Sequence, residues 1–283
     1  MAIHFPHATW RLIQNKPASG AWNMAVDEAI LEASGRGQSP PTLRLYAWDP
    51  GCLSLGYAQP FSDVSMPELT ARGWDLVRRP TGGRAILHID ELTYSVAGPL
   101  DDPRLAGGVL ESYHRLSLAL LDGLKRMGIL AKAQPQKSAS TENDSSISND
   151  LNPVCFEVPS NYEITIQGKK LIGSAQARRK GGVLQHGSLP LYGDLTRITR
   201  VLSFQNPKER AQAAQRLSLR AITSEQILNS SPAWRDVADT LVAAFQEKLN
   251  LELQLMDLTP AEYERAAQLH DEKYTAPSWT ERI

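Results

Sequence analysis

The chain of 283 residues carries 30 Lys and Arg against 31 Asp and Glu, a formal net charge of −1. This balance excludes the strongly basic surface of a general nucleic-acid-binding protein, so we expect no nucleic-acid partner. No apolar run reaches the ~20 residues of a membrane span and the N-terminal residues lack a signal-peptide pattern, so we expect no membrane partner. The two cysteines make no disulfide framework, which indicates a reducing compartment, the cytoplasm.

The first half of the chain alternates short β-rich runs with helical patterns. Ser19 is a suitable N-cap for a helix with an apolar face, and Gly35 and Gly37 end that helix. A turn signal at residues 49–51 separates two apolar runs. In chain order, the pattern predicts strands at 10–13, 43–45, 52–55, 74–77 and 92–96, and helices after Ser19, at about 67–72 and at about 110–128.

Residues 134–152 contain almost no apolar side chains. Such a segment cannot bury enough surface to offset the entropy of ordering, so we expect a flexible polar loop. The elements expected after it are strands at 162–166, 170–177 and 183–191, turns at 167–169 and 178–182, helices at about 223–228 and 233–249, a strand at 251–255 and a helix near Glu262. Irregular interleaving of strands and helices predicts one mixed α+β domain over residues 1–283, with a short helical C-terminal extension after about 256.

The segment 79–88 carries the clearest sign of a ligand site. Gly82 and Gly83 can adopt positive φ and bring bare backbone N–H groups against a ligand. Arg79 and Arg84 flank this turn with guanidinium donors suited to a carboxylate, a phosphate or a polarised carbonyl. The alternative for so short a motif is an ordinary hairpin turn with solvated arginines.

Cys155 is the candidate nucleophile. A thiol attacks only as the thiolate, so it needs a lowered pKa or a nearby base, and His88 or His186 could supply that base. The alternative is a small buried hydrophobic residue, which is the usual fate of a free cysteine. We favour that alternative for Cys52, which lies inside an apolar run.

Lys170 lies in an apolar strand context. Period-two geometry places Lys170, Ile172, Ser174 and Gln176 on one face of that strand. An inward lysine is costly unless it pairs with an anion or polarises a substrate, and the alternative is a strand-end lysine that reaches solvent. Lys169 is expected to be a solvated turn residue.

His186 lies in the next predicted strand, where an exposed structural histidine is the alternative to a site residue. Asp90 and Glu91 follow His88 closely, but adjacent strand residues point to opposite faces, so we do not expect them to form an acid–base pair. No Cys/His cluster has zinc-ligand spacing, and no phosphate-loop signature occurs, so no metal is expected.

These motifs, in this order, resemble the lipoyl-pathway acyltransferase and ligase superfamily, which also includes the biotin ligases. The resemblance covers most of the chain and lies in residues 10–13 with 19–28, 78–85 with His88, 168–176, 186–189, and 273–274 with 278–280. The turn with Arg84 and the Cys155-Phe156 pair are similar to the cysteine-dependent octanoyltransferases. ATP-dependent lipoate ligases usually carry a third glycine at the position of Arg84.

The resemblance implies a mixed β-sheet flanked by helices, as in biotin/lipoyl protein ligase-like catalytic domains. It implies transfer of an octanoyl group from octanoyl-acyl carrier protein, through a thioester on Cys155, to a lysine of a lipoyl-domain acceptor such as the glycine cleavage H protein. Lys170 would orient the acyl carbonyl or assist proton transfer, and no cofactor is required. The implied substrate-binding residues are Arg79, Gly82, Gly83, Arg84, His88, Gly173, Ser174, Ala175, His186 and Gly187.

Two alternatives stay open from the sequence. An ATP-dependent lipoate-protein ligase would use the same glycine turn and Lys170 to form a lipoyl-adenylate. A non-catalytic lipoyl-domain-binding or acyl-binding module would keep the fold without the chemistry. Cys155 argues against the ligase, and Cys155 together with Lys170 argues against the binding module.

Overall fold

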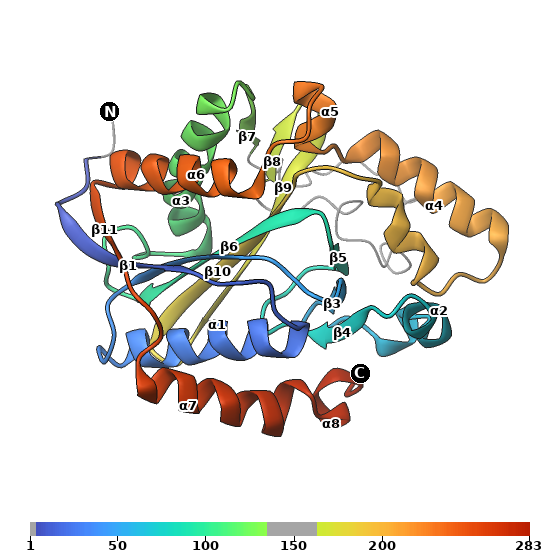
Figure 1. The fold of residues 1–283 in the computed structure, drawn as a ribbon, viewed down its shortest axis with the longest axis horizontal. Helices are drawn as coiled ribbons and strands as arrows, with labels where there is room; N and C mark the ends of the chain where they lie inside the picture. The colour runs from blue at the N-terminus through green and yellow to red at the C-terminus, as the bar shows by residue number, and fades with distance from the viewer. Residues whose placement is uncertain (1–3, 135–162) are drawn as a thin grey trace, which may run out of the picture.

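Two β-sheets and the helices packed on them form the protein, a computed structural model that describes residues 4–134 and 163–283 (Figure 1). The larger sheet has the strand order β11 (Leu251–Leu255), β1 (Ala8–Gln14), β2 (Thr42–Tyr46), β6 (Glu91–Pro99), β10 (Gly182–Pro190), β9 (Lys169–Arg179), β8 (Glu163–Ile166) and β7 (Lys132–Gln134). The smaller sheet has the order β4 (Asp75–Arg78), β3 (Cys52–Leu55) and β5 (Ile86–His88). Within the larger sheet β1 is parallel to β11 and β2, and the other pairs are antiparallel, which confirms the mixed α+β architecture.

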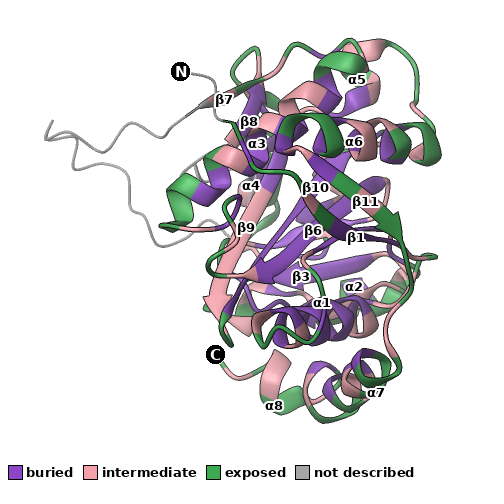
Figure 2. Ribbon diagram, turned by 90° about the vertical axis from the view of Figure 1, so that its left-hand side faces the viewer, coloured by how far each residue is buried: buried purple, intermediate pink, exposed green. Residues whose placement is uncertain are grey.

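Helices cover both faces of the larger sheet. On one face lie α3 (Val109–Arg126) and α6 (Trp234–Leu249), which pack against each other, and on the other face lies α1 (Gly20–Gly35) (Figure 1). Below α1 runs α7 (Pro260–Leu269), so that side of the sheet carries two helical layers (Figure 2). The remaining α-helices are α2 (Met66–Ala71), α4 (Pro207–Arg220), α5 (Ser224–Leu228) and α8 (Pro277–Thr280).

The first helix begins where its N-cap predicts. The Ser19 hydroxyl accepts a hydrogen bond from the Trp22 backbone N–H at 3.3 Å, which satisfies one of the free donors of the first turn. The helix is buried on more than the one face that the sequence pattern indicates, and Met24 and Leu31 are buried too. Met24 lines a cavity beside the sheet and Leu31 lies next to Gly182 of β10, while α7 covers the side of α1 that points away from the sheet.

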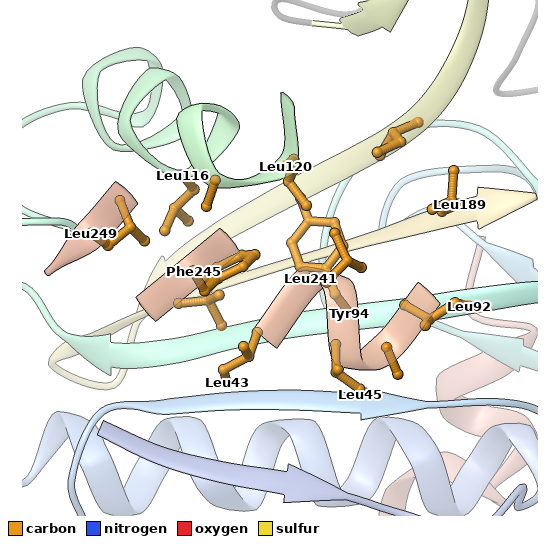
Figure 3. Close-up of a cluster of buried hydrophobic side chains, with 14 of the residues drawn as sticks. Leu43, Leu45, Leu92, Tyr94, Leu116, Leu120, Leu189, Leu241, Phe245 and Leu249 are labelled. Atoms are coloured by element: carbon orange, nitrogen blue, oxygen red, sulfur yellow. The ribbon is translucent and has the colours of Figure 1, made fainter. Parts of the chain in front are cut away.

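Alternation along the strands sends their side chains to two different layers. Leu43 and Leu45 of β2 join the apolar layer under α3 and α6, which Figure 3 shows in close-up. Between them, Arg44 points to α1, where its guanidinium meets Asp27. The apolar layer is built from leucines of strands and helices together with Tyr94 and Phe245, and it holds the helices α3 and α6 on the sheet.

Several elements differ from the predicted ones. The turn predicted at 178–182 is shorter, because β9 continues to Arg179 and Lys180 and Gly181 alone turn the chain, with φ of +55° and +77°. The pattern missed β5, β7 and α4, of which the strands are three residues long and the helix buries only Ala213 and Leu217. Gln134, the first residue of the expected loop, ends β7, and residues 135–152 lie outside the described residues.

A bulge in β9 breaks strict alternation next to Lys170. In the pairing with β8, Ile164 lies opposite Ile172 and Thr165 lies opposite Lys170, so Leu171 is the extra residue. Leu171 and Ile172 are both buried in the layer under α3 and α6. The expectation that Lys170 shares a face with Ile172, Ser174 and Gln176 is therefore wrong, because the bulge resets the phase of the strand.

Candidate functional site

A cavity of about 230 Å³ lies between the two sheets, beside the N-terminal turn of α3. It brings together most of the residues singled out by the sequence, although they come from distant segments. The predicted site residues around it are Arg79, Gly82, Gly83, His88, Gly173, Ser174, Ala175, His186 and Gly187. Apolar and aromatic side chains complete the wall, among them Trp48, Ile86, Val109 and Tyr113. The shape and composition suit an apolar ligand with one polar end.

The glycine turn forms part of this wall. Gly83 has φ of +90°, a conformation that needs glycine, and both Gly82 and Gly83 are exposed. Gly56 packs so closely on the turn that a Cβ there would lie 1.8 Å from the Gly83 carbonyl oxygen. Neither the Gly82 nor the Gly83 N–H donates a hydrogen bond to any residue in the described parts of the chain. These two donors are therefore available to a ligand.

Arg79 contributes to the site by holding the turn. It is buried, and its Nε and Nη2 donate to the Gly82 carbonyl at 3.2 and 2.8 Å, while Nη2 also donates to the Arg84 carbonyl at 2.7 Å. Its Nη1 donates to the carbonyl and the hydroxyl of Ser54 at 3.0 and 3.1 Å. These contacts hold the guanidinium against the turn and against Ser54 of β3, and its contact with a substrate stays a prediction.

Arg84 lies outside the wall of the cavity. Its half-buried side chain makes no hydrogen bond or ion pair with the residues at 4–134 and 163–283, and its backbone carbonyl is held by Arg79. It stays a proposed substrate contact on the resemblance alone.

His186 is buried, where the sequence allowed for an exposed strand histidine. Its Nδ1 lies 3.2 Å from Asp27 Oδ2, and its Nε2 lies 2.6 Å from the Thr81 hydroxyl at the start of the glycine turn. Burial lowers the pKa of His186, and Asp27 offsets this only in part, so the neutral imidazole is favoured. Burial by itself would raise the pKa of Asp27, but the Arg44 guanidinium at 2.7 Å and His186 hold it below its usual range.

His88 makes a second chain of the same kind. Its Nδ1 lies 2.7 Å from Glu91 Oε1 and its Nε2 lies 2.8 Å from the Ser54 hydroxyl. Burial by itself would raise the pKa of Glu91, but His88 and the hydroxyls of Ser188 and Thr93 hold it below its usual range. Glu91 is therefore a buried carboxylate with each charge-bearing oxygen satisfied.

An aromatic ring fixes the second imidazole in the wall. The Trp48 ring stacks on His88 with the ring centres 4.0 Å apart, and its indole N–H donates to the Thr93 hydroxyl at 2.8 Å. The polar groups of the wall are thus bonded to one another, and what remains facing the cavity is largely carbon.

Lys170 is buried but does not line this cavity. Its Nζ lies 2.8 Å from Glu163 Oε1, so the cost of burying the ammonium is offset by a carboxylate from the neighbouring strand. Lys169, by contrast, is at the surface side of the turn and donates to the Ser218 carbonyl at 3.1 Å. Lys170 is thus the inward lysine of the two, whereas Lys169, expected as a solvated turn residue, is half-buried as the first residue of β9.

Cys155 and its neighbours lie outside the described residues. Cys52, the free cysteine among the described ones, is fully buried in β3. Burial first, and then the nearby Asp75 and Glu91, raise the pKa of its thiol well above the usual value. Cys52 is therefore an inert core residue, which is the interpretation favoured from its sequence context.

Sequence reasoning missed several polar residues of the site. Asp27 lies in a predicted helix and Thr81 just before the glycines, where nothing in the periodicity marks them. Glu91 was set aside because it is adjacent to Asp90; the two do point apart, and Asp90 pairs with Arg197 at the surface side while Glu91 turns inward. The signal that could have found Glu91 is its spacing of three from His88.

The described parts of the chain show neither a cluster of metal ligands nor a membrane-spanning helix. No three His, Cys, Asp or Glu side chains come together there as metal ligands. Across residues 4–134 and 163–283 no helix has the length and apolar character to cross a bilayer.

The chain is similar to known proteins both in sequence and in structure. Residues 19–246 match the family model of the lipoyl protein ligase A/B catalytic domain. The octanoyltransferase LipM of Kyrpidia tusciae is 41% identical over 97% of this chain and 99% of its own, and that of Carboxydothermus hydrogenoformans is 40% identical over 97% and 99%. A solved chain from the archaeal lipoylation system of Thermoplasma acidophilum, a bipartite lipoate protein ligase and its E2 lipoyl domain, superposes with a TM-score of 0.77 at 26% identity, covering 97% of each chain.

Proposed function

The chain belongs to the lipoyl protein ligase A/B catalytic-domain family, and from that premise we propose how it carries out octanoyl transfer in protein lipoylation. It is an acyltransferase with an acyl donor and a lipoyl-domain acceptor. We assign octanoyl-acyl carrier protein as the donor and the glycine cleavage H protein, or a similar lipoyl domain, as the acceptor. The cytoplasm is the proposed place of the reaction.

The cavity beside the glycine turn is the observation that carries the proposal. Its carbon-rich wall suits an alkyl chain, and burial of the seven alkyl carbons of an octanoyl group at ~0.8 kcal/mol each contributes up to about 6 kcal/mol. At its rim, the N–H groups of Gly82 and Gly83 suit the carbonyl oxygen of an acyl group. An acyl chain with its carbonyl at the turn would use both features at once.

The proposed reaction has two acyl-transfer steps on Cys155. In the first, the thiolate attacks the thioester carbon of the donor, a new thioester forms on the enzyme, and the carrier leaves as its thiolate, which takes up the proton that Cys155 lost. In the second, the neutral amine of the acceptor lysine attacks that thioester, the amide forms, and the enzyme thiolate leaves and takes up the proton that the amine loses. Thioester exchange is close to neutral in free energy and the amide is more stable, so the sequence needs no ATP.

Lys170 supplies positive charge to these steps in the proposal. Its ammonium is buried and already paired with Glu163, so it is held in place rather than free to reach solvent. Lys170 does not line the cavity, so the proposal requires the acyl carbonyl to come near this cation in the reacting complex, where the cation would stabilise the negative charge that develops on oxygen.

The proposal is tested by mixing the protein with octanoyl-carrier protein and an apo lipoyl domain without ATP, and weighing every species by mass spectrometry. We expect a single hydroxylamine-sensitive octanoyl adduct on the enzyme and then one octanoyl amide on the acceptor. Cys155→Ala should lose both products, because the remaining cysteine of the sequence, Cys52, is buried in β3. Cys52→Ala is the matched control and should keep both products.

Two outcomes would overturn the transferase route. Full transfer by Cys155→Ala would remove the thioester intermediate. Transfer that requires ATP and free octanoate would favour the ligase alternative, in which the same turn holds an acyl-adenylate.

A further inference from the structure

Two chains of hydrogen bonds, each made of a carboxylate, an imidazole and a hydroxyl, lead to the glycine turn. One runs from the Asp27 carboxylate through the His186 imidazole to the Thr81 hydroxyl, and the other from the Glu91 carboxylate through the His88 imidazole to the Ser54 hydroxyl. Both carboxylates are buried, Asp27 at 0% and Glu91 at 6% exposure. They come from different elements, the first from α1 and the second from β6.

The partners of Asp27 set the direction of the first chain. Its Oδ1 accepts hydrogen bonds from Arg44 at 2.7 Å and Ser95 at 2.9 Å, and its Oδ2 accepts one from Tyr46 at 2.9 Å. A carboxylate that is ionised only accepts, so the His186 Nδ1 must carry the proton. In the neutral ring Nε2 is then the acceptor, and the Thr81 hydroxyl donates to it.

The second chain follows the same logic and continues into the turn. Glu91 accepts from His88 Nδ1, so that nitrogen carries a proton, and a ring with its single proton there accepts from the Ser54 hydroxyl through Nε2 at 2.8 Å. The same Ser54 oxygen accepts from Arg79 Nη1 at 3.1 Å, and the other nitrogens of Arg79 hold the Gly82 carbonyl. Thus Glu91 is linked to the turn by three successive hydrogen-bonded side chains.

A purely structural ion pair elsewhere in the protein looks different. Arg11 and Glu262 form a buried bidentate pair with two contacts of 2.6 Å, and neither residue lines the cavity or contacts a histidine in the described parts of the chain. Asp27 and Glu91 instead each bond an imidazole that lines the cavity. These two buried carboxylates therefore orient an imidazole ring at the site, in addition to joining two elements of the fold.

We propose that Asp27 and Glu91 are positioning residues, which fix His186 and His88 in the tautomer with the proton on Nδ1 and thereby hold the glycine turn in its acyl-binding shape. The inference rests on the proposed function in one respect, that the turn receives the acyl group. The first chain of hydrogen bonds reaches the turn at Thr81, directly before the glycines. The second reaches it from Ser54 through Arg79.

The test replaces each carboxylate by its isosteric amide, in Asp27→Asn and Glu91→Gln. An amide can donate to Nδ1, which drives the proton to Nε2 and forces the Thr81 or Ser54 hydroxyl to turn away. In protein labelled with ¹⁵N-histidine, we expect NMR to show one ring changing tautomer in each variant. In single-turnover acylation by octanoyl-carrier protein, we expect the acylation rate constant to fall about 10–100-fold, the range known for loss of a carboxylate that orients a metal-ligating histidine.

Two further sets of variants make the test decisive. Thr81→Val and Ser54→Ala remove the hydroxyls and keep the carboxylates, so each should lose acylation like the matching amide variant without changing the tautomer. The doubles Asp27→Asn/Thr81→Val and Glu91→Gln/Ser54→Ala should lose no more than the worse single, because each pair acts through one chain. Glu262→Gln is the control for a buried carboxylate without histidine and should keep tautomers and acylation where it is folded.

The outcomes separate this inference from the proposed function. Unchanged tautomers in the amide variants, or tautomers that change while acylation stays at the wild-type rate, overturn the positioning role. If an amide variant does not fold, loss of acylation in Thr81→Val or Ser54→Ala supports the role, and wild-type acylation in both overturns it. Wild-type protein that forms no acyl-enzyme at all would overturn the proposed reaction, while the NMR result would still decide the tautomers.

Discussion

The two faces of the larger sheet are equally buried and differ in kind. Towards α3 and α6 the strands present Leu43, Leu45 and Leu92, which join one continuous apolar layer (Figure 3). Towards α1 the intervening residues of β2 are Arg44 and Tyr46, which are buried just as deeply. Figure 2 shows that the central strands β2, β6 and β10 are buried almost throughout, whereas β9 is largely intermediate and the edge strand β11 is partly exposed.

The difference shows where burial serves packing and where it serves chemistry. An apolar side chain gains free energy wherever it leaves water, whereas a buried charge costs free energy unless a partner offsets the loss of hydration. On the α1 face each such charge has its partner, as Arg44 has Asp27. That face also supplies the polar wall of the cavity through Thr93, His186 and Ser188.

Replacement of Arg44 by Met has the largest expected effect, because it removes one buried charge from the face towards α1. Arg44→Met leaves the Asp27 carboxylate buried without its cation, which costs about 3–5 kcal/mol of unfolding free energy. It should also slow acylation of the enzyme, because Asp27 orients His186. Denaturant unfolding and single-turnover acylation, both at a temperature where the variant is folded, measure the two effects.

Leu45→Ala is the matched control, one position further along the same strand and on the other face. Loss of a buried leucine costs about 2–5 kcal/mol, so the stability loss is similar. Acylation of the folded Leu45→Ala variant should stay near the wild-type rate. Equal losses of acylation in the two variants would show that the faces do not divide packing from chemistry.

The apolar face is the part that the sequence predicts well. Alternation around Leu43 and Leu45, the Ser19 N-cap and the stripe of α3 each depend on local spacing, and local spacing survives folding. The polar face is not predictable in that way. Arg44 and Asp27 carry the pattern of solvated residues, and only their meeting across 17 positions of sequence makes their burial possible.

The residues of the candidate site also differ in whether the local sequence marks them. The glycine turn and His88 stand out as a local motif, so the sequence was sufficient for them. Glu91 and Ser54 have no local mark of function, because their role exists only once β3, β5 and β6 lie side by side. Lys170 was found by its context, but its face was wrong because a single extra residue in β9 resets the alternation.

The next effect in size compares the two adjacent lysines that directly precede that bulge. Lys170→Ala should reduce octanoyl transfer by roughly 10²–10³-fold, as expected for the loss of a group that stabilises developing charge. Lys169→Ala removes only an exposed contact with the Ser218 carbonyl and should transfer at the wild-type rate. Rates of amide formation on the acceptor measure both, and equal losses would mean that the buried pair of Lys170 with Glu163 is structural.

The smallest expected effect is a change in how the free energy of unfolding depends on pH. It distinguishes the face towards α1 from the apolar face. Burial holds the pKa of His186 below the usual 6.5, so in the window below 6.5 the unfolded chain binds a proton that the folded protein does not. Unfolding free energy therefore falls as the pH falls through that window, by at most about 1.4 kcal/mol per pH unit for one group. Besides burial, Asp27 from α1 raises the pKa of this ring, while Arg79 after β4 and His88 from β5 lower it.

His186→Gln should flatten this slope between about pH 6.5 and the folded pKa, because the variant has no proton to gain there. His114→Gln, at an exposed position of α3, should leave the slope as it is. Leu45→Ala should lower the whole curve without changing its shape, since the apolar face it belongs to holds no group that titrates in this range. Denaturant unfolding of the three variants at half-unit steps of pH measures the slopes. A wild-type slope in His186→Gln would show that the buried imidazole is not what couples stability to pH, and would place that coupling away from the α1 face.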